Sequence, residues 1–379
     1  MDLEALRGEI DEIDSELVRL FCRRMDTVRA VAQYKSEHGL PVFHPERERK
    51  VIEKVSARAG KEYGTGAGVL FQTIMDISKS YQHIQLSGER GARLRAQIGA
   101  ALGGGATLPK KARVACQGVP GAYSHEAARQ MFPSPDLSFC GQFEDVFEAV
   151  RSGECDYGVL PIENSSNGSV TRVYDLLRDY RLTICRSYKL PVNHCLLTSG
   201  ETDLLKLTDI YSHEQGLGQC SQFLRQNPQL RVHVYRNTAA AAKFVAESGS
   251  ATAAAIASEE CAKLYGLTVA ARDFQNARQN FTRFICMGRE LIIEPGANKI
   301  SLSLTLPHTA GSLYRLISRF AAQSLNLTKL ESRPLPDTDF EFLFYFDFEG
   351  SVREKPVLDL LCSLQEELGH FEFLGNYKG

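Results

Sequence analysis

Apolar residues spaced alternately by three and four positions run through the first twenty residues, and this pattern strongly limits how the chain can begin to fold. They are Leu3, Leu6, Ile10, Ile13, Leu17 and Leu20. Such a heptad pattern predicts one long amphipathic helix. Helix breakers follow near residues 39–45, a second helix is expected from about Glu46, and a third over residues 68–82. Residues 1–90 are therefore expected to form an all-helical unit, whose long first helix needs a second chain to bury its apolar seam, in a homodimer or a higher homo-oligomer.

The rest of the chain shows three different patterns, which together predict a multidomain protein. Residues 91–112 contain a glycine run amid dense charge and are expected to be a linker. Residues 113–290 alternate strand-like runs with amphipathic stretches, which predicts an α/β domain. Residues 298–379 read strand, helix, strand, strand, helix, strand, the βαββαβ order of an α+β, ferredoxin-like unit.

Bulk composition excludes several classes of protein. The 379 residues carry 44 Lys and Arg against 46 Asp and Glu, so the net charge of −2 gives no basic field for nucleic acid. No apolar run is long enough to span a membrane, and the acidic, amphipathic start does not resemble a signal peptide. Ten cysteines show neither C-x-x-C pairs nor metal-ligand spacing. These features predict a cytoplasmic enzyme with reduced thiols, and no metal or cofactor is implied.

Two cations interrupt the apolar face of the first predicted helix. Arg24 continues the heptad seam, and Lys35 returns to the same face eleven residues later. Cations on an apolar face need an anion, which is either a bound ligand or a structural partner such as Glu46 or Glu48. Arg7 lies about 25 Å from Arg24 along the helix, so it is too distant to share a small ligand with it within one chain.

Three stretches around these cations resemble the all-helical chorismate mutases: "LRGEIDEIDSELVRLFCRRMDTVRAVAQYK", "PVFHPERER" and "FQTIMDISKSYQ". The resemblance implies that the carboxylates of chorismate bind to Arg24, Ser78 and, from a partner chain, Arg7. It also implies that Lys35 and Gln82 donate to the ether oxygen, and that Glu48, supported by Arg47, binds the ring hydroxyl. Where the family often has aspartate this chain has His44, so Glu48 is expected to carry more of the hydroxyl contact.

Small polar residues follow several strand-like runs of the α/β segment. Ser124, Ser169, Ser212 and Thr238 are expected at or near helix starts; each alone is typical of a plain helix cap, whereas together they indicate an anion-binding crevice. A further run, "FTRFICM", suits a strand but contains Arg283. Alternation places Thr282 and Phe284 on one face and Arg283 on the other. From these three residues alone, a structural ion pair of Arg283 is the alternative to a functional role.

Four motifs of this segment resemble prephenate dehydratase: "GVPGAYS" at 118–124, "VLPIENS" at 159–165, "SHEQ" at 212–215 and "QNFTRF" at 279–284. The resemblance implies two α/β lobes, similar to periplasmic binding proteins, around a cleft. Thr282 is expected to contact the leaving hydroxyl and Phe284 to form a wall, while Glu163 or a water that it orients supplies the proton. Arg283 is expected to anchor a carboxylate or to order the cleft. The remaining expected substrate contacts are Ser124, Asn164, Ser165 and Gln215. Glu214 replaces a proline that is frequent in the family.

The last segment resembles an ACT regulatory domain in the stretches "TAGSLYRLI" and "LTKLESRP". The resemblance implies an amino-acid site made by two groups of residues, Gly311, Ser312 and Leu313 with Asn326, and Glu331, Ser332 and Arg333. Ser312 and Tyr314 depart from the usual motif. The alternative is a pairing module without a ligand.

These resemblances together identify the chain as a member of the bifunctional chorismate mutase/prephenate dehydratases. The expected activity converts chorismate to prephenate and prephenate to phenylpyruvate, with inhibition by L-phenylalanine. Two rivals are an amino-acid receptor with no catalysis and a mutase fused to prephenate dehydrogenase. The second lacks a nicotinamide-binding fingerprint.

Overall fold

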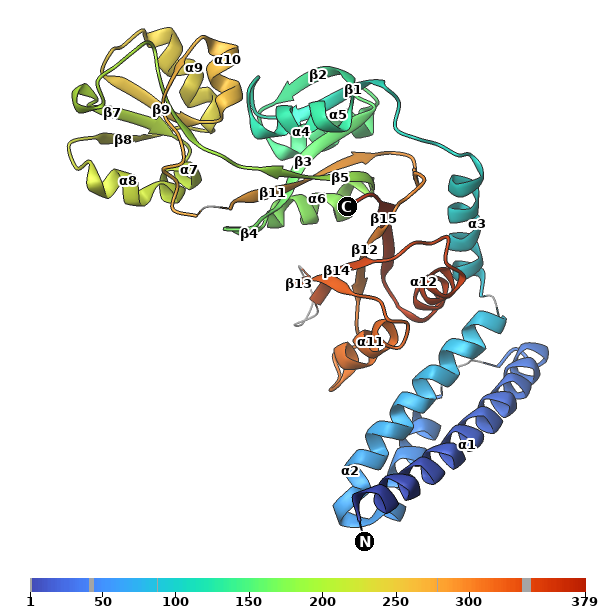
Figure 1. Ribbon diagram of the computed structural model, residues 1–379. Helices are drawn as coiled ribbons and strands as arrows, with labels where there is room; N and C mark the ends of the chain where they lie inside the picture. The colour runs from blue at the N-terminus through green and yellow to red at the C-terminus, as the bar shows by residue number, and fades with distance from the viewer. Residues whose placement is uncertain (1, 41–43, 87, 278, 336–341) are drawn as a thin grey trace. The chain divides into compact units, whose positions relative to one another are not determined.

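The computed structural model describes residues 2–40, 44–86, 88–277, 279–335 and 342–379 (Figure 1). The chain divides into two compact units. The first comprises Met1–Ala100 and Leu302–Glu372, and the second comprises Ala101–Ser301 and Phe373–Gly379. None of the described helices combines the length and the hydropathy that crossing a membrane requires.

The N-terminal segment is helical, as the heptad pattern predicts. Helix α1 covers Leu3–Glu37 and begins at Asp2, whose carboxylate accepts a hydrogen bond from the Ala5 amide at 2.8 Å. Helix α2 covers Pro45–Leu86, but Gly60 interrupts it with a φ of +76°, so two helices meet there. The expected three helices are therefore confirmed, with the third beginning directly after Gly60 rather than near residue 68.

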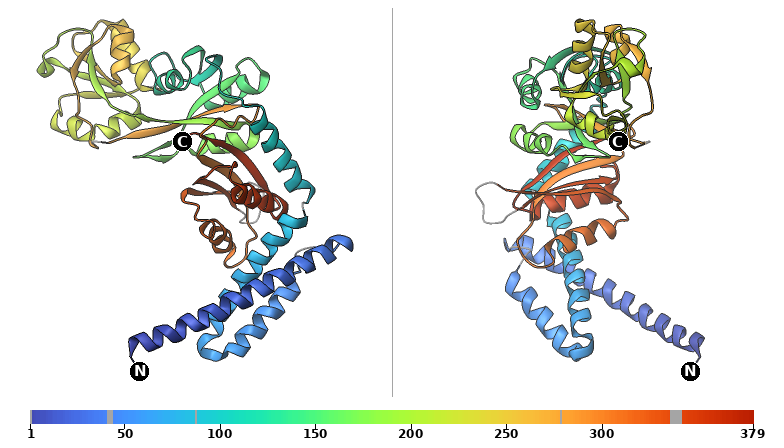
Figure 2. Two further views of the ribbon diagram at one scale, coloured as in Figure 1. Left: turned by 45° about the vertical axis from the view of Figure 1, so that its right-hand side comes forward. Right: turned by 90° about the vertical axis from the view of Figure 1, so that its left-hand side faces the viewer.

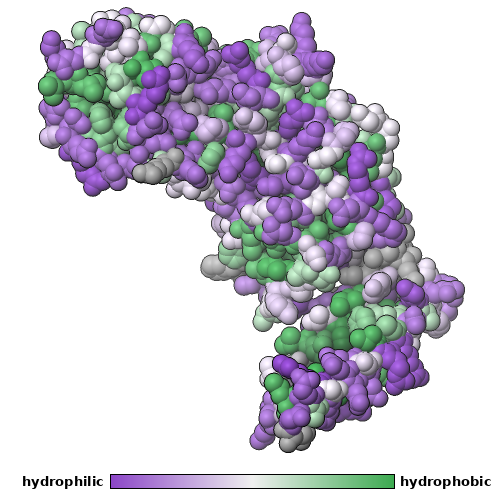
Figure 3. Space-filling view, viewed as in Figure 1, coloured by the Kyte–Doolittle hydropathy of each residue, from purple (hydrophilic) through white to green (hydrophobic). Residues whose placement is uncertain are grey.

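The apolar seam of α1 is exposed in the single chain. Leu3, Ile10 and Leu17 are among its members and are 61%, 55% and 51% exposed. Figure 3 shows apolar side chains among the polar ones on the visible surface of the helical segment, in the lower part of the view. A seam of this length that finds no partner within its own described chain is suited to a second helix.

The expected linker at 91–112 is wrong for most of its length. Residues 89–103 form helix α3 (Glu89–Gly103), which packs against helix α12 (Lys355–Glu367) of the same compact unit. The Arg95 guanidinium donates to Asp359 at 2.6 Å. A Cβ on Gly91 would lie 2.7 Å from the Cys362 carbonyl oxygen, so glycine allows the two helices to approach closely. Leu94 and Ile98 are buried with it, and this apolar spacing outweighs the surrounding charge and glycines.

The C-terminal segment has the predicted ferredoxin-like order. Its elements are β12 (Lys299–Thr305), α11 (Ser312–Ala321), β13 (Leu327–Pro334), β14 (Phe342–Glu349), α12 and β15 (Phe371–Tyr377), and the strands pair in the order β13-β14-β12-β15. Residues 302–372 belong to the first compact unit, while the end of β15 belongs to the second. The expected independent domain over 298–379 is thus corrected at both ends.

The second unit contains two α/β lobes, as predicted (Figures 1 and 2). The first lobe has the sheet order β2-β1-β3-β11-β5, with β4 paired to β3. Its strands are β1 (Lys111–Gln117), β2 (Ser134–Cys140), β3 (Tyr157–Asn164), β4 (Gly168–Ser169), β5 (Thr183–Pro191) and β11 (Phe281–Gly288), and its helices are α4 (Tyr123–Met131), α5 (Phe143–Ser152) and α6 (Thr171–Tyr180). Strand β11 is antiparallel to both of its neighbours, β3 and β5.

The second lobe has the sheet order β10-β6-β9-β7-β8. Its strands are β6 (Cys195–Thr198), β7 (Asp209–Ser212), β8 (Arg231–Val234), β9 (Ala253–Ala257) and β10 (Thr268–Ala271). Its helices are α7 (Glu214–Gln219), α8 (Ser221–Gln226), α9 (Thr238–Ser248) and α10 (Glu259–Tyr265), with a 3-10 turn, η1, at Leu204–Lys206. Buried alanines on α9 and β9 share one core cluster, and their small side chains let this helix and sheet pack closely.

Candidate active sites

A cavity of about 580 Å³ lies between α1 and α2. It is lined by six residues that the sequence singled out: Arg24 and Lys35 on α1, and Arg47, Glu48, Ser78 and Gln82 on α2. The helical periodicity that placed Arg24 and Lys35 on one face therefore leads to a common cavity. Arg7 does not line it; its side chain is 63% exposed and lies 3.5 Å from Glu4.

Arg24 is held by a hydroxyl rather than by a carboxylate. Its Nη1 donates to the Ser78 hydroxyl, and no carboxylate of the described chain forms an ion pair with it. Glu48 instead accepts from Lys79 at 3.0 Å, and Lys79 also lies 2.9 Å from Asp76. The alternative in which Arg24 pairs with Glu46 or Glu48 is therefore wrong, and the cavity retains an arginine available to an anion. Burial lowers the pKa of this guanidinium.

The pKa of Lys35, the second cation that the sequence placed on this face of α1, is also lowered by its surroundings. Burial lowers the pKa of Lys35, repulsion from Arg47 lowers it further, and Glu48 opposes both effects. Gln82 is buried and donates from Nε2 to the Ser78 carbonyl at 3.3 Å, while its Oε1 finds no partner in the described part of the chain. A hydrogen-bond donor of a ligand in this cavity would satisfy that oxygen, and the second proton on Nε2 is left to donate to an acceptor. Sequence reasoning missed Lys79, whose role as the counter-ion of Glu48 depends on contacts between turns of α2 that lie far apart in sequence.

A second cavity, of about 490 Å³, is lined by both lobes of the α/β unit. Thr282 and Phe284 of β11 line it together with Asn164 and Ser124 of the first lobe and Gln215 of the second. Thr282 and Phe284 thus face the same side, as alternation along the strand predicts. A register irregularity follows Arg283, where Arg283 lies opposite Glu163 and Phe284 opposite Pro161.

The amide of Asn164 is a hydrogen-bond donor to the Thr282 hydroxyl. Its Oδ1 accepts the Ser166 and Asn167 amides at 2.9 and 3.0 Å, so Nδ2 must point the other way. Nδ2 donates to Thr282 Oγ1 at 2.9 Å, and it also lies within hydrogen-bond distance of Asn280 Oδ1 and the Phe281 carbonyl. Because Thr282 Oγ1 accepts this bond, its own proton is left to donate into the cavity.

Arg283 lies on the opposite face, away from this cavity. Its Nε and Nη2 donate to Glu163 Oε2 at 3.2 and 3.1 Å, and its Nη1 lies 3.4 Å from the Tyr377 hydroxyl. Neither Glu163 nor Arg283 lines the Thr282 cavity, so the structure does not bring the expected proton source or carboxylate anchor to it. Ser165 does not line this cavity either, and its hydroxyl accepts a hydrogen bond from the Phe281 amide at 2.9 Å.

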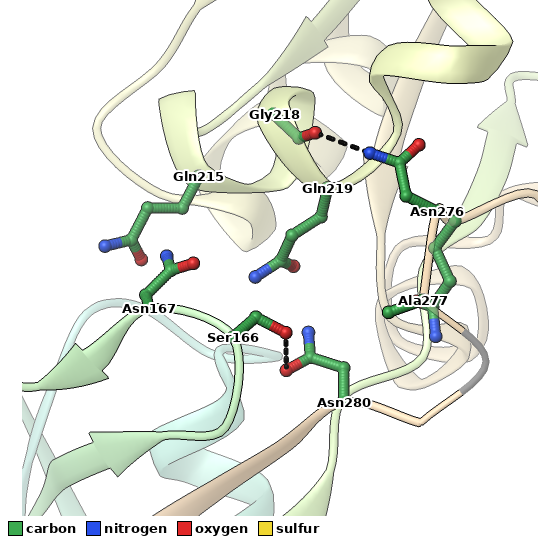
Figure 4. A pocket seen from close by; sticks show the side chains of 9 residues that line it. Ser166, Asn167, Gln215, Gly218, Gln219, Asn276, Ala277 and Asn280 are labelled. Carbon is green, nitrogen blue, oxygen red and sulfur yellow. Dashed lines mark hydrogen bonds between the residues drawn. The ribbon is translucent and has the colours of Figure 1, made fainter.

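A smaller hollow of about 290 Å³ shares three residues with the Thr282 cavity, namely Asn167, Gln215 and Gln219. Figure 4 shows amide side chains from both lobes around this space, with Asn280 bound to Ser166 at its lower edge. Asn280 Nδ2 is buried and has no partner in the described part of the chain. All the side chains of this lining are uncharged.

Further residues of the Thr282 cavity were missed from the sequence. His194 Nε2 donates to Gln219 Oε1 at 2.8 Å, and its Nδ1 lies 3.1 Å from the Tyr123 hydroxyl. Burial lowers the pKa of His194 despite the bond to Gln219, which favours the neutral ring. Arg236 also lines the cavity and has no ion-pair partner among the described residues. "RNTAAAAKF" drew attention only to Thr238, because an arginine before a helix has no distinctive pattern.

Three expected helix caps are corrected. Ala122, not Ser124, is the N-cap of α4, and Ser124 lies buried in its first turn. Asn237 caps α9 by accepting the Ala240 amide at 2.7 Å, which leaves Thr238 as the first helical residue. The Ser212 hydroxyl donates to the Ile256 carbonyl at 2.7 Å, and His213 caps α7 in its place. In each case a neighbouring residue occupies the capping position, a shift of one or two residues that local preferences do not determine.

The predicted effector residues separate into two places. Ser312 and Leu313 line a small hollow of about 130 Å³ together with Phe342 and Phe344, and Gly311 begins the helix with a φ of +79°. Glu331, Ser332 and Arg333 lie on β13 outside this lining, as does Asn326, which donates to Glu349 at 3.1 Å. Ser312 is itself bonded to Thr309 and Arg315, at 2.8 and 2.9 Å. Residues 336–341 lie outside the described residues.

No metal-binding group of three or more His, Cys, Asp or Glu side chains occurs in the described part of the chain. Each of the ten cysteines is a free thiol. A helical cavity with cations and a two-lobed cavity with a directed hydroxyl, arginines and amides define a multidomain enzyme that acts on small anions.

Comparisons with known proteins support this class. The chain matches the chorismate mutase type II family over residues 6–83 and the prephenate dehydratase family over residues 114–291. It is 35% identical to the bifunctional chorismate mutase/prephenate dehydratase of Escherichia coli K12, over 99% of this chain and 96% of that protein. It is 40% identical to arogenate dehydratase/prephenate dehydratase 2 of Arabidopsis thaliana, over 70% of this chain and 73% of that protein.

Among solved structures, prephenate dehydratase from Arthrobacter aurescens in complex with L-Phe is similar, with a TM-score of 0.64 and 28% identity. The match covers 70% of this chain and 90% of that one. The chain belongs to the family of bifunctional chorismate mutase/prephenate dehydratases.

Proposed function

We propose that the helical cavity rearranges chorismate to prephenate. The reaction is pericyclic and needs no acid, base or nucleophile; it needs a folded substrate conformer and stabilisation of negative charge on the ether oxygen. Arg24, held by Ser78, is placed to bind a carboxylate. Lys35 and Gln82 are the donors for the ether oxygen, and Glu48 is an acceptor for the ring hydroxyl. The observation that carries this proposal is a cavity in which Arg24 has a hydroxyl partner and no carboxylate within the described chain.

Arg7 of a partner chain is proposed to complete this cavity. Arg7 is exposed and does not line the cavity of its own chain, and the apolar seam that carries it is exposed as well. A homodimer in which two α1 helices pair would bury that seam and bring a second chain's residues to each cavity.

The two-lobed cavity is proposed to convert prephenate to phenylpyruvate. Loss of CO₂ from C1 supplies the electron pair that expels hydroxide from C4, one proton converts the hydroxide to water, and the ring becomes aromatic. Hydroxide is a poor leaving group, so a donor must be directed at it. Thr282 fits this role because Asn164 occupies an acceptor site of its oxygen and leaves the proton to point into the cavity. Since Glu163 is bonded to Arg283 away from the cavity, we infer that the proton comes from solvent through Thr282.

The lining favours prephenate over arogenate, which carries an ammonium group in place of the keto group. Arg172 and Arg236 line the cavity, whereas no Asp or Glu of the described chain does so. Arg172 is bonded to Glu144 at 2.6 Å, and Arg236 is free to meet a carboxylate. An ammonium group would meet positive charge without a carboxylate partner, which is unfavourable in a cavity partly closed to water.

The C-terminal sheet is proposed to be an ACT regulatory domain that binds L-phenylalanine and inhibits the dehydratase. Support comes from its ferredoxin-like order, from the Gly311 turn at the start of α11, and from the L-Phe complex of the Arthrobacter aurescens dehydratase. The hollow beside Ser312 and Phe344 is the candidate for the aromatic ring. A cytoplasmic location is proposed as well, and is supported by ten free thiols.

One experiment tests both activities. The protein is incubated with chorismate, and phenylpyruvate is followed by its absorbance in alkali. We expect phenylpyruvate to form, prephenate to serve equally when supplied directly, and arogenate to react at least about tenfold more slowly. No consumption of chorismate or prephenate would favour the receptor alternative, and accumulation of prephenate alone would refute the dehydratase assignment.

A further inference from the structure

Arg283 connects the strands behind the Thr282 cavity to the end of β15. Its Nε and Nη2 both donate to Glu163 Oε2, on the neighbouring strand β3. Its Nη1 lies 3.4 Å from the Tyr377 hydroxyl, which in turn lies 2.6 Å from the Ser301 hydroxyl. The Arg283 side chain is only 13% exposed, and Tyr377 is fully buried. We call Glu163, Arg283 and Tyr377 the rear triad.

The end of β15 is firmly held where it meets the rear triad. The Ser187 amide of β5 donates to the Lys378 carbonyl at 3.0 Å, and the Asn298 amide donates to the Tyr377 carbonyl at 3.0 Å. Gly375 has a φ of +153°, and a Cβ there would lie 2.2 Å from the Ile184 carbonyl oxygen. Only glycine allows the backbone to pass this close to β5. Tyr377 therefore reaches Arg283 from a segment with little freedom to move.

Glu163 and Arg283, the two members of the rear triad on the first-lobe sheet, are each adjacent in sequence to a residue that lines the Thr282 cavity. Glu163 precedes Asn164 in the chain, and Arg283 follows Thr282. The strands that carry the 2.9 Å hydrogen bond between Asn164 and Thr282 on the cavity face are therefore also joined by the ion pair between Glu163 and Arg283 on the opposite face. Neighbouring side chains on a strand point to opposite faces but share one backbone. A shift of Arg283 therefore changes the direction of the Thr282 hydroxyl, and a misplacement of about 1 Å costs on the order of 10²-fold in rate.

We propose that Arg283 and Tyr377 are positioning residues of the dehydratase site, through which the end of β15 sets the geometry of Thr282 and Asn164. Glu163 has the same positioning role, as the ion-pair partner of Arg283, and is not the proton donor. The proposal rests on the proposed dehydratase function and deepens it. Because β15 begins in the four-stranded sheet proposed to bind phenylalanine, its backbone and the contact between Tyr377 and Arg283 also give the effector a route to the cavity.

The test replaces Tyr377 by phenylalanine, which removes one oxygen and keeps the buried ring. We expect kcat for prephenate to fall about three- to tenfold with KM changed less than about twofold, because Thr282 acts on the leaving hydroxyl in the transition state. We also expect inhibition by phenylalanine to weaken about fivefold, and mutase activity to stay unchanged. Tyr157→Phe is the matched control: it removes a phenol from β3 of the same lobe, and its hydroxyl has no hydrogen bond to the described residues.

A structural role alone would lower the melting temperature of Tyr377→Phe and leave its kcat and its response to phenylalanine at wild-type values, as in Tyr157→Phe. That result for Tyr377→Phe overturns the proposal. The wild-type rate with prephenate tests the dehydratase function separately, since it does not depend on any variant.

A double-mutant cycle tests the route through Arg283. Glu163→Gln and Tyr377→Phe each remove one partner of the same guanidinium. If both act through it, the double variant should lose only about as much kcat as the more affected single variant. Single effects that multiply would show two independent causes and overturn the shared route. An alkaline limb of the pH–rate profile, in which activity falls as pH rises, that disappears in Glu163→Gln would instead make Glu163 the proton donor and refute the proposal.

Discussion

Replacement of Thr282 by valine is the sharpest test of the dehydratase site. Valine keeps the β-branched shape that the strand position accommodates and removes only the hydroxyl. Loss of one donor directed at developing negative charge typically lowers kcat by about 10²–10³-fold, or about 3–4 kcal/mol. We expect a loss of this size for prephenate, and Thr282→Ser should retain much of the activity because the donor survives.

The same structure predicts a small effect of Thr282→Val on folding. Asn164 Nδ2 loses the 2.9 Å bond to Thr282 but keeps Asn280 Oδ1 and the Phe281 carbonyl as acceptors. The free energy of unfolding should therefore fall by only about 1 kcal/mol. Phenylpyruvate formation measures the dehydratase, and consumption of chorismate by the same preparation is an internal control for folding. A valine variant that dehydrates prephenate within about threefold of the wild-type rate would refute the assignment of the leaving-group contact.

Three further predictions concern the mutase and the first compact unit. Arg7→Ala and Lys35→Ala should each be nearly inactive as mutases. Refolding the two variants together should restore about a quarter of wild-type mutase activity, because half of randomly assembled dimers are mixed and half of the sites in a mixed dimer are intact. No recovery of activity would mean that both residues act within one chain. Burial lowers the pKa of Lys35, so mutase activity should fall as pH rises, at a pH below that at which an ordinary lysine loses its proton. A Lys35→Arg variant that shows the same fall at high pH would contradict the assignment of this fall to Lys35. A chain beginning at Glu89 should unfold at a higher temperature than a chain beginning at Lys110, because the shorter chain lacks α3 and exposes the face of α12 that α3 covers. Equal melting temperatures of the two chains would contradict the packing of α3 on α12.

Periodicity determined much of this protein before any tertiary contact was known. The heptad spacing predicted that α1 is one long helix, and helical periodicity predicted the common face of Arg24 and Lys35, because a helix repeats every 3.6 residues whatever it packs against. The two-residue repeat of β11 likewise separated Thr282 and Phe284 from Arg283. The order of strands and helices was enough to predict an α/β segment and the ferredoxin-like sheet, whereas the two lobes were implied by the resemblance to prephenate dehydratase.

What the sequence left open depended on which distant residues meet. Local reading assigned α3 to a linker because its charge and glycines are conspicuous, while the surface of α12 that it covers lies more than 250 residues away. The partner of Arg283 was also left open, because either a ligand or a carboxylate of the chain could balance its charge. Only the pairing of β3 with β11 brings Glu163 within 3.1 Å of it, and only the packing of β15 adds Tyr377. Side-chain types and periods are local properties, whereas the partner of a buried charge is chosen by the fold.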